Sequence, residues 1–69
     1  MDINQQEDEW IATMSYPETH EIDGSPGDHA VAAVAQEYAV NLAEIRSRVV
    51  RYHDDGVTVV VSRGTDGQV

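Results

Sequence analysis

The sequence predicts a small α+β domain with a β-α-α-β order, in which a pair of helices packs on a two-stranded antiparallel sheet. Three observations lead to this prediction. Residues 29–54 contain two successive runs of apolar side chains at helical spacing, separated by a helix-start signal at Asn41. Residues 9–16 alternate apolar and polar side chains, as a strand with one buried face does. Residues 57–63, VTVVVSR, are rich in β-branched side chains, which favour an extended backbone.

The chain is expected to form one domain, because 69 residues are too few for two hydrophobic cores. Residues 1–8 are polar and acidic without periodicity, so we expect a disordered acidic tail there and a single folded domain over residues 9–69. The core would be rich in Val and Ala, with no Phe, and so small a core is marginal on its own. A homodimer is therefore expected.

The first strand is expected over residues 9–16, with Trp10 and Met14 on its apolar face. Pro17 would end this strand, because proline has no backbone N–H to donate to a neighbouring strand. A helix is the alternative for the same segment, since Trp10, Ile11 and Met14 also fit helical spacing.

The first helix is expected over residues 30–38, where apolar side chains recur at helical spacing. The connection before it is a loop, or a weak strand around residues 20–22. Two residues are candidates for the N-cap of this helix. Ser25 would act with Pro26 at the first helical position, and Asp28 is the other choice.

The second helix is expected to begin at Asn41, because Asn41 followed three residues later by Glu44 is the pattern of a capping box. Residues 54–56, Asp-Asp-Gly, would end it, with the glycine free to adopt a left-handed conformation. One long helix that continues through residues 39–40 is the alternative. The apolar stripe of the second helix would consist of Leu42, Ile45, Val49 and Tyr52.

The charge balance is unusual, with 13 acidic residues against four basic ones and a net charge of -9. All the basic residues are Arg, and there is no Lys. Abundant acids, absent Lys and a core of small aliphatic residues together resemble proteins of salt-loving archaea. An ordinary acidic mesophilic protein is the alternative. Three of the four Arg lie in residues 29–53, which hold only two acids, so this segment alone is not strongly negative.

Composition also limits the function classes. The chain has no Cys, which excludes disulfides and Cys-based metal sites, and the spacing of His20, His29 and His53 does not match a zinc motif. No serine has the context of an activated nucleophile. We therefore expect no enzyme, no cofactor and no metal. No apolar run is long enough to span a membrane, and the N-terminal sequence is unlike a secretory signal, so a cytoplasmic location is expected.

The expected helix pair resembles the helix-turn-helix of small transcription regulators and antitoxin-like proteins, over about a third of the chain. The residues that carry the resemblance are Ala35, Ala39, Val40 and Ile45. The sequence departs from the motif at Ala39, where Gly is commoner in the turn, and at Arg48, where an aliphatic residue usually packs. The resemblance implies that the second helix is a recognition helix that enters the major groove of duplex DNA.

Transcription regulation by DNA binding is the first functional expectation. The candidate DNA-binding residues are Asn41, Arg46, Ser47, Arg48 and Arg51, together with Arg63 from the strand that follows. The net charge of -9 opposes this function, because neutralisation of phosphates supplies much of the affinity for DNA. A plain helical hairpin that binds nothing is the structural alternative.

The second functional expectation is a small dimeric, antitoxin-like module that binds a protein partner without binding DNA. It depends on the strand over residues 57–61 and on the apolar face of residues 10–16, which have the composition of an interface between subunits. The simpler explanation of both strands is that they pair with each other inside one chain.

The acid excess generates a testable prediction, namely folding that depends on salt. Repulsion among the acidic side chains destabilises the compact state in dilute buffer, and molar KCl screens that repulsion. The melting temperature, followed by circular dichroism, is expected to rise steadily between low and molar KCl. A melting temperature that is unchanged or lower at molar KCl would contradict the adaptation to high salt.

Overall fold

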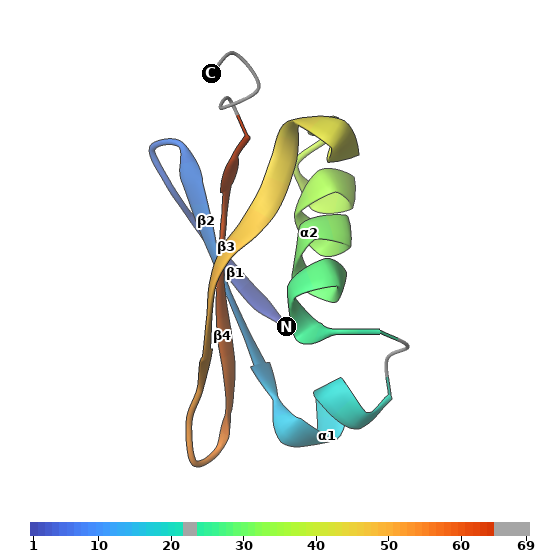
Figure 1. The fold of residues 1–69 in the computed structure, drawn as a ribbon, viewed down its shortest axis with the longest axis vertical. Helices are drawn as coiled ribbons and strands as arrows, with labels where there is room; N and C mark the ends of the chain where they lie inside the picture. Colours follow the sequence, from blue (N-terminus) through green and yellow to red (C-terminus); the bar gives the residue numbers. More distant parts are fainter. Residues whose placement is uncertain (22–23, 65–69) are drawn as a thin grey trace.

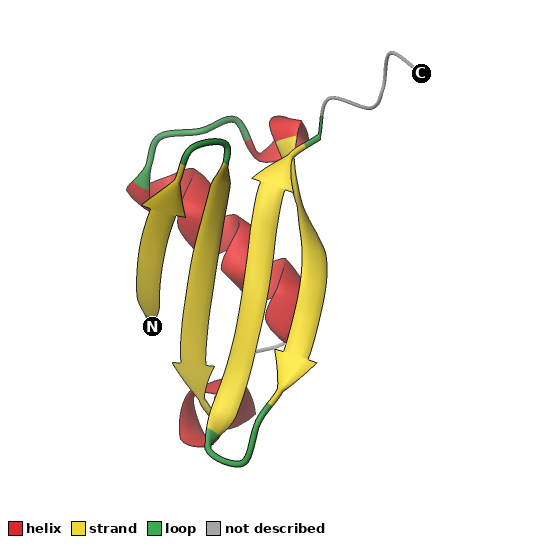
Figure 2. Ribbon diagram, turned by 90° about the vertical axis from the view of Figure 1, so that its left-hand side faces the viewer, coloured by secondary structure: helices red, strands yellow, loops and turns green. Residues whose placement is uncertain are grey.

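The protein has two layers, a four-stranded antiparallel sheet and a helix that crosses one of its faces (Figures 1 and 2). A computed structural model describes residues 1–21 and 24–64. The strands lie in the order β1-β2-β4-β3. In chain order the elements are β1 (Asp2–Gln6), β2 (Glu9–Ser15), the short helix α1 (Tyr16–His20), α2 (Pro26–Glu37), the 3-10 turn η1 (Leu42–Glu44), β3 (Ile45–Tyr52) and β4 (Gly56–Arg63).

The hydrophobic core lies between α2 and the face of the sheet that we call the inner face. Alternate side chains of β2 and β4 point into it, which confirms the strand pattern expected for these two segments. The two strands pair antiparallel, as expected, with Trp10 opposite Val61 and Met14 opposite Val57. The buried core residues are Trp10, Ala12, Met14, Ala30, Val34, Ile45, Val57, Val59 and Val61.

Helix α2 begins and ends at identifiable signals. Ser25 is the N-cap, and its hydroxyl accepts a hydrogen bond of 3.2 Å from the backbone N–H of Asp28. The helix stops before Ala39, which has a left-handed backbone with φ of 55°. The N–H of Val40 then donates to the carbonyl of Ala35 over 3.1 Å, the closing bond of a left-handed C-terminal motif. The first helix is thus confirmed, and one long helix through this point is excluded.

The predicted second helix is wrong, and with it the β-α-α-β fold. Asn41 does act as a cap, since its side chain accepts a hydrogen bond from Ala43, but only the single turn η1 follows. Residues 45–52 then form β3, which pairs with β4. The pairing shifts register between Ser47 and Val49, as a β-bulge does. This shift places Ile45 and Val49 on opposite faces of the sheet, so their four-residue spacing only imitates a helical stripe.

The sheet has four strands rather than the predicted two, because β1 and β3 extend it at both edges. Strand β1 lies in the segment expected to be a disordered tail. Ile3 explains why this segment is ordered, since it pairs with Ala12 of β2 and packs against the core. Tyr16 was expected in the first strand and residues 18–20 in a loop, but residues 16–20 form α1, which begins with a capping box between Ser15 and Glu18.

Two further expectations fall outside the described residues, wholly or in part. The weak strand considered around residues 20–22 reaches beyond the described range, although His20 itself is the last residue of α1. The dipeptide Asp66-Gly67 also predicts a turn, and it lies entirely outside the described range.

Gly56 generates a prediction about stability. It pairs with Ser15 at the start of β4, and a Cβ added there would overlap the carbonyl oxygen of Met14. Gly56→Ala must therefore push β2 and β4 apart, and it is expected to lower the free energy of unfolding by about 1–3 kcal/mol. Chemical denaturation in molar KCl measures this change.

Gly27→Ala is the matched control. A Cβ at Gly27 would lie 2.9 Å from the hydroxyl oxygen of Ser47, which can rotate away, and alanine favours the helix. This variant is expected to lose less than about 1 kcal/mol. Equal losses in the two variants would contradict the close approach of β2 to β4 at Gly56.

Candidate functional site

The face of the sheet opposite α2, which we call the outer face, is the candidate site. Figure 2 looks onto this face, and none of the described helices or loops lies over it. Its side chains form three rows that cross the four strands in register. The central row is Asn4, Ile11, Val60 and Val49. The row on one side of it is Asp2, Thr13, Thr58 and Arg51, and the row on the other side is Gln6, Glu9, Ser62 and Arg46.

The central row gives the outer face an apolar middle. Ile11, Val60 and Val49 are neighbours on β2, β4 and β3, and each is only half-buried. Their remaining exposure is contiguous, because side chains directly opposite each other on adjacent strands are in contact distance. The strip is small, because all three side chains are less exposed than Leu42, Val50 and Tyr52, which lie outside the three rows of this face. It is nevertheless the part of the outer face that offers apolar contact to a partner.

The two flanking rows carry opposite charges at opposite edges of the sheet. Asp2 lies on the edge strand β1, and Arg51 lies in the same row on the other edge strand, β3. In the other flanking row, Glu9 accepts a hydrogen bond of 2.9 Å from Arg48, which reaches it from the bulge in β3. Basic side chains therefore belong to one edge of this face and acidic side chains to the other half.

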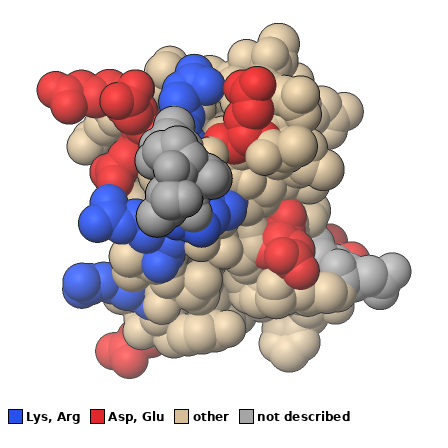
Figure 3. Space-filling view, turned by 45° about the horizontal axis from the view of Figure 1, so that its top comes forward, with Lys and Arg blue, Asp and Glu red and all other residues tan. Residues whose placement is uncertain are grey.

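The outer face is a local exception to the acid excess of the chain. It holds three Arg and two acids, whereas the whole chain has four Arg and 13 acids. Figure 3 shows the basic side chains gathered in one area of the surface with acidic side chains around them. Repulsion of an approaching acidic partner is therefore weakest at this face.

The structure brings together only some of the predicted site residues. Arg46, Arg48 and Arg51 share the outer face, but they lie on a strand and not on a recognition helix. Ser47 points to the inner face, where its hydroxyl lies against Gly27, and Asn41 caps η1. The helix that was expected to enter the major groove is therefore not formed.

Arg63, predicted as a contact to the DNA backbone, has a structural setting of its own. Its guanidinium carbon lies 5.4 Å from the centre of the Trp10 ring, in a cation–π contact. The same guanidinium is 3.9 Å from a carboxylate oxygen of Glu44. Arg63 thus covers the end of the core. At that end of the sheet it also lines one hollow with Arg46 and Arg48, whereas Arg51 is not among the residues of this hollow.

The signal for the apolar row was present in the sequence. Val49 and Val50 are two consecutive β-branched residues, which favour an extended backbone over a helix. The helical interpretation of residues 45–52 concealed it. Ile11 was assigned to the face opposite Trp10, but without β3 it had only Val60 beside it.

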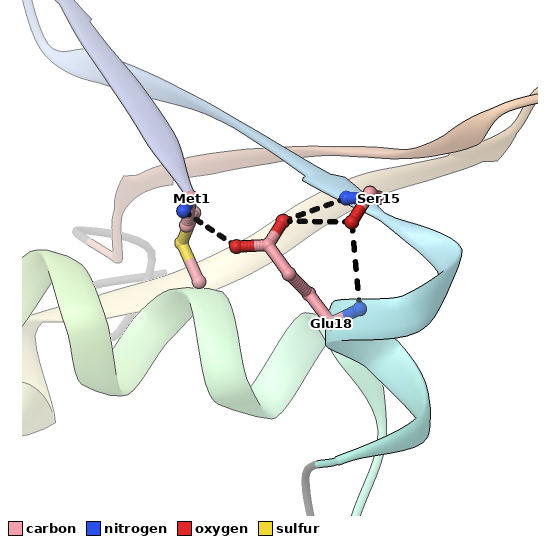
Figure 4. Close-up of polar contacts among 3 residues, drawn as sticks. All are labelled: Met1, Ser15 and Glu18. Atoms are coloured by element: carbon pink, nitrogen blue, oxygen red, sulfur yellow. Dashed lines mark hydrogen bonds and ion pairs between the residues drawn. The ribbon is translucent and has the colours of Figure 1, made fainter.

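The chain start, α1 and β2 meet in a polar cluster beside the outer face, where Met1 and Glu18 line one hollow with Asp2 and Thr13 (Figure 4). One carboxylate oxygen of Glu18 lies 2.7 Å from the Met1 ammonium, and the other accepts a hydrogen bond of 2.7 Å from the backbone N–H of Ser15. The hydrogen bond to the ammonium is the main cause that lowers the pKa of Glu18, and the contact with Glu18 raises the pKa of the ammonium. This cluster fixes α1 to the end of β1.

The described part of the chain contains no group of three or more His, Asp or Glu side chains placed to hold a metal ion. His53 instead contacts Thr58, with 3.0 Å between its Nε2 and the hydroxyl oxygen. Within the same residues, no helix has the length and hydropathy needed to cross a membrane.

Comparison with known proteins identifies no relative of this chain. No family, no functionally characterised protein and no solved structure matches it. The geometry of the outer face is therefore the basis of the proposed function.

The Glu18 cluster generates a prediction about pH. Glu18→Gln removes the charge pairing with the Met1 ammonium, so wild type is expected to be more stable than the variant between about pH 4.5 and 8. The difference shrinks as pH falls through the lowered pKa of Glu18, and also as pH rises through the raised pKa of the ammonium. Thermal melts across pH, at the lowest KCl that keeps both proteins folded, measure it.

Glu21→Gln is the control, because it removes one negative charge next to the same short helix without touching the ammonium. The difference in stability between Glu21→Gln and wild type is expected not to shrink at either the low or the high end of the pH range. A Glu18→Gln difference that stays constant from pH 3 to pH 10 would show that the ion pair does not stabilise the fold.

Proposed function

We propose that the protein is a small dimeric protein–protein interaction module that binds through the outer face of its sheet. One observation carries the proposal: the apolar strip and the local loss of the acid excess coincide on the same face. Apolar contact supplies the affinity, and the low local charge allows approach to a second acidic surface. A cytoplasm with a high salt concentration is part of the proposal, and the acid excess without Lys supports it.

The edges of the sheet favour binding through the face rather than strand addition. Strand β3 is an edge strand, but a bulge interrupts it and three Arg lie along it. Charged side chains and bulges are the features by which proteins prevent pairing at an exposed edge. Strand β1 is the other edge and has only five residues, most of them exposed and polar. The outer face has none of these protective features in its middle.

Duplex DNA is the second candidate partner, and one observation supports it. Arg46, Arg48 and Arg51 lie along one strand, and strands as well as helices read DNA grooves in known complexes. Against it stand the net charge of -9 and the pairing of Arg48 with Glu9. Protein binding is therefore the stronger proposal.

The proposed function predicts a dimer in solution. Light scattering at high micromolar concentration is expected to give twice the mass of one chain, with a dimer fraction that grows with KCl as repulsion between acidic copies is screened. Val49→Asp introduces a charge into the apolar strip and is expected to yield a monomer. Leu42→Asp is the matched control, because Leu42 is 55% exposed on η1, away from the strip, and should leave the dimer intact.

The same preparations separate the two candidate partners. Fluorescence polarisation with duplex DNA, from low to high KCl, is run on wild type and on the double variant Arg48→Ala/Arg51→Ala. Under the proposal the two proteins behave alike and neither binds at any salt that keeps them folded. Binding by wild type that the double variant loses would favour DNA, and a monomer throughout would remove the dimeric module.

A further inference from the structure

We propose that two copies pack outer face to outer face about a twofold axis that runs parallel to the strands, between β2 and β4. In this arrangement Arg51 of each copy meets Asp2 of the other. The inference deepens the proposed function and depends on it, because it specifies the second copy as the partner of the outer face and fixes the relative orientation of the two sheets. It is derived from symmetry, from the row positions and from charge.

If the strands of the two sheets pack aligned rather than orthogonal, symmetry leaves two ways to stack this face on itself. Identical subunits of a closed dimer are related by a twofold axis, which lies in the plane midway between the two sheets. The axis runs along the strands or across them, to within the rotation of about 30° that twisted sheets impose. Each choice sets a different strand of the partner against β3.

An axis across the strands brings like charges together. It places β3 over β3 of the second copy and exchanges the two flanking rows. Arg51 would then lie over Arg46 of the partner subunit, and the reverse contact follows by symmetry. Two such contacts set like charges against each other in a closed interface, which is unfavourable.

An axis along the strands brings opposite charges together. It places β3 over β1 and β4 over β2, while each row stays over the same row of the second copy. Arg51 then lies over Asp2 of the partner subunit, and this contact occurs twice. In the central row, Ile11 lies over Val60 of the partner subunit, so the apolar strips meet at the axis.

The charge distribution of the rest of the chain agrees with this arrangement. In the described residues, only Asp2 and Glu9 of the acidic side chains belong to the three rows of the outer face, so few acids of one copy would meet those of the other. Four strands spaced about 4.8 Å apart make a face only about 20 Å wide. The buried area is therefore small for a specific interface, and the dimer is expected to dissociate in the micromolar range.

A charge exchange tests the arrangement. Arg51→Asp and Asp2→Arg, made separately, each set like charges against each other at both contacts. Each is expected to raise the dimer dissociation constant about fivefold or more, as measured by sedimentation at the lowest KCl that keeps the proteins folded. The double variant Arg51→Asp/Asp2→Arg restores opposite charges and has the net charge of wild type. Its dissociation constant is expected to return to within about twofold of the wild-type value.

Glu37→Arg is the matched control for Asp2→Arg, because it changes the net charge equally but lies on α2, away from the outer face. It should leave the dimer unchanged or make it slightly tighter. Circular dichroism confirms that every variant folds. A double variant that dimerises no better than the weaker single variant overturns the arrangement, as do single variants that dimerise like wild type.

Cross-linking separates failure of the arrangement from failure of the proposed function. The chain has no Cys, so a single introduced Cys reports one position. Thr13→Cys lies beside the proposed axis, and a short bismaleimide is expected to link it to its counterpart. Glu37→Cys is expected to give no link. If wild type is a dimer but only Glu37→Cys links, the arrangement is wrong and the module stands, whereas a monomeric wild type removes both.

Discussion

Pairing of β4 at both of its edges is the constraint on which the rest of the structure depends. Val57, Val59 and Val61 of this strand are fully buried against α2. A strand with such a face cannot leave its backbone N–H and C=O groups unpaired, because a buried polar group without a partner is costly. Strand β2 pairs with one edge and β3 with the other. The need for the second partner draws residues 45–52 into the sheet.

The sequence was sufficient to predict the elements whose pattern is local. Strands β2 and β4 follow from alternation and β-branched residues, and α2 follows from its apolar spacing and the Ser25 cap. Strand β3 was missed because its bulge breaks the alternation, and because Asn41 caps one turn as it would cap a helix. Residues 54–56, expected to end a helix, instead connect β3 to β4. Asp54 and Asp55 form the hairpin turn, and Gly56 begins β4 without the expected left-handed conformation, while the N–H of His53 donates to its carbonyl over 2.7 Å.

The sequence was enough to predict which segment carries the basic residues of the candidate site, but not which of them lie on the same face. Residues 29–53 are the segment without an acid excess, and the structure places three of their Arg on one face. In a regular strand, Arg51 would point to the face opposite Arg46 and Arg48, because side chains alternate. The bulge between Ser47 and Val49 shifts this alternation by one residue and places all three Arg on the same face. Arg63 and Ser47 point elsewhere because their strand positions alternate with those of the outer face. A helical reading of the same residues could not have separated these two sets.

The extended conformation of residues 45–52 is the central claim, since the outer face and its charge pattern exist only if β3 pairs with β4. Nuclear magnetic resonance in molar KCl measures it directly. Contacts between protons of Val50 and Val59, and of Arg51 and Thr58, are expected, together with chemical shifts of extended backbone across residues 45–52. Helical shifts in this segment, with contacts between residues three apart and none to β4, would contradict the account.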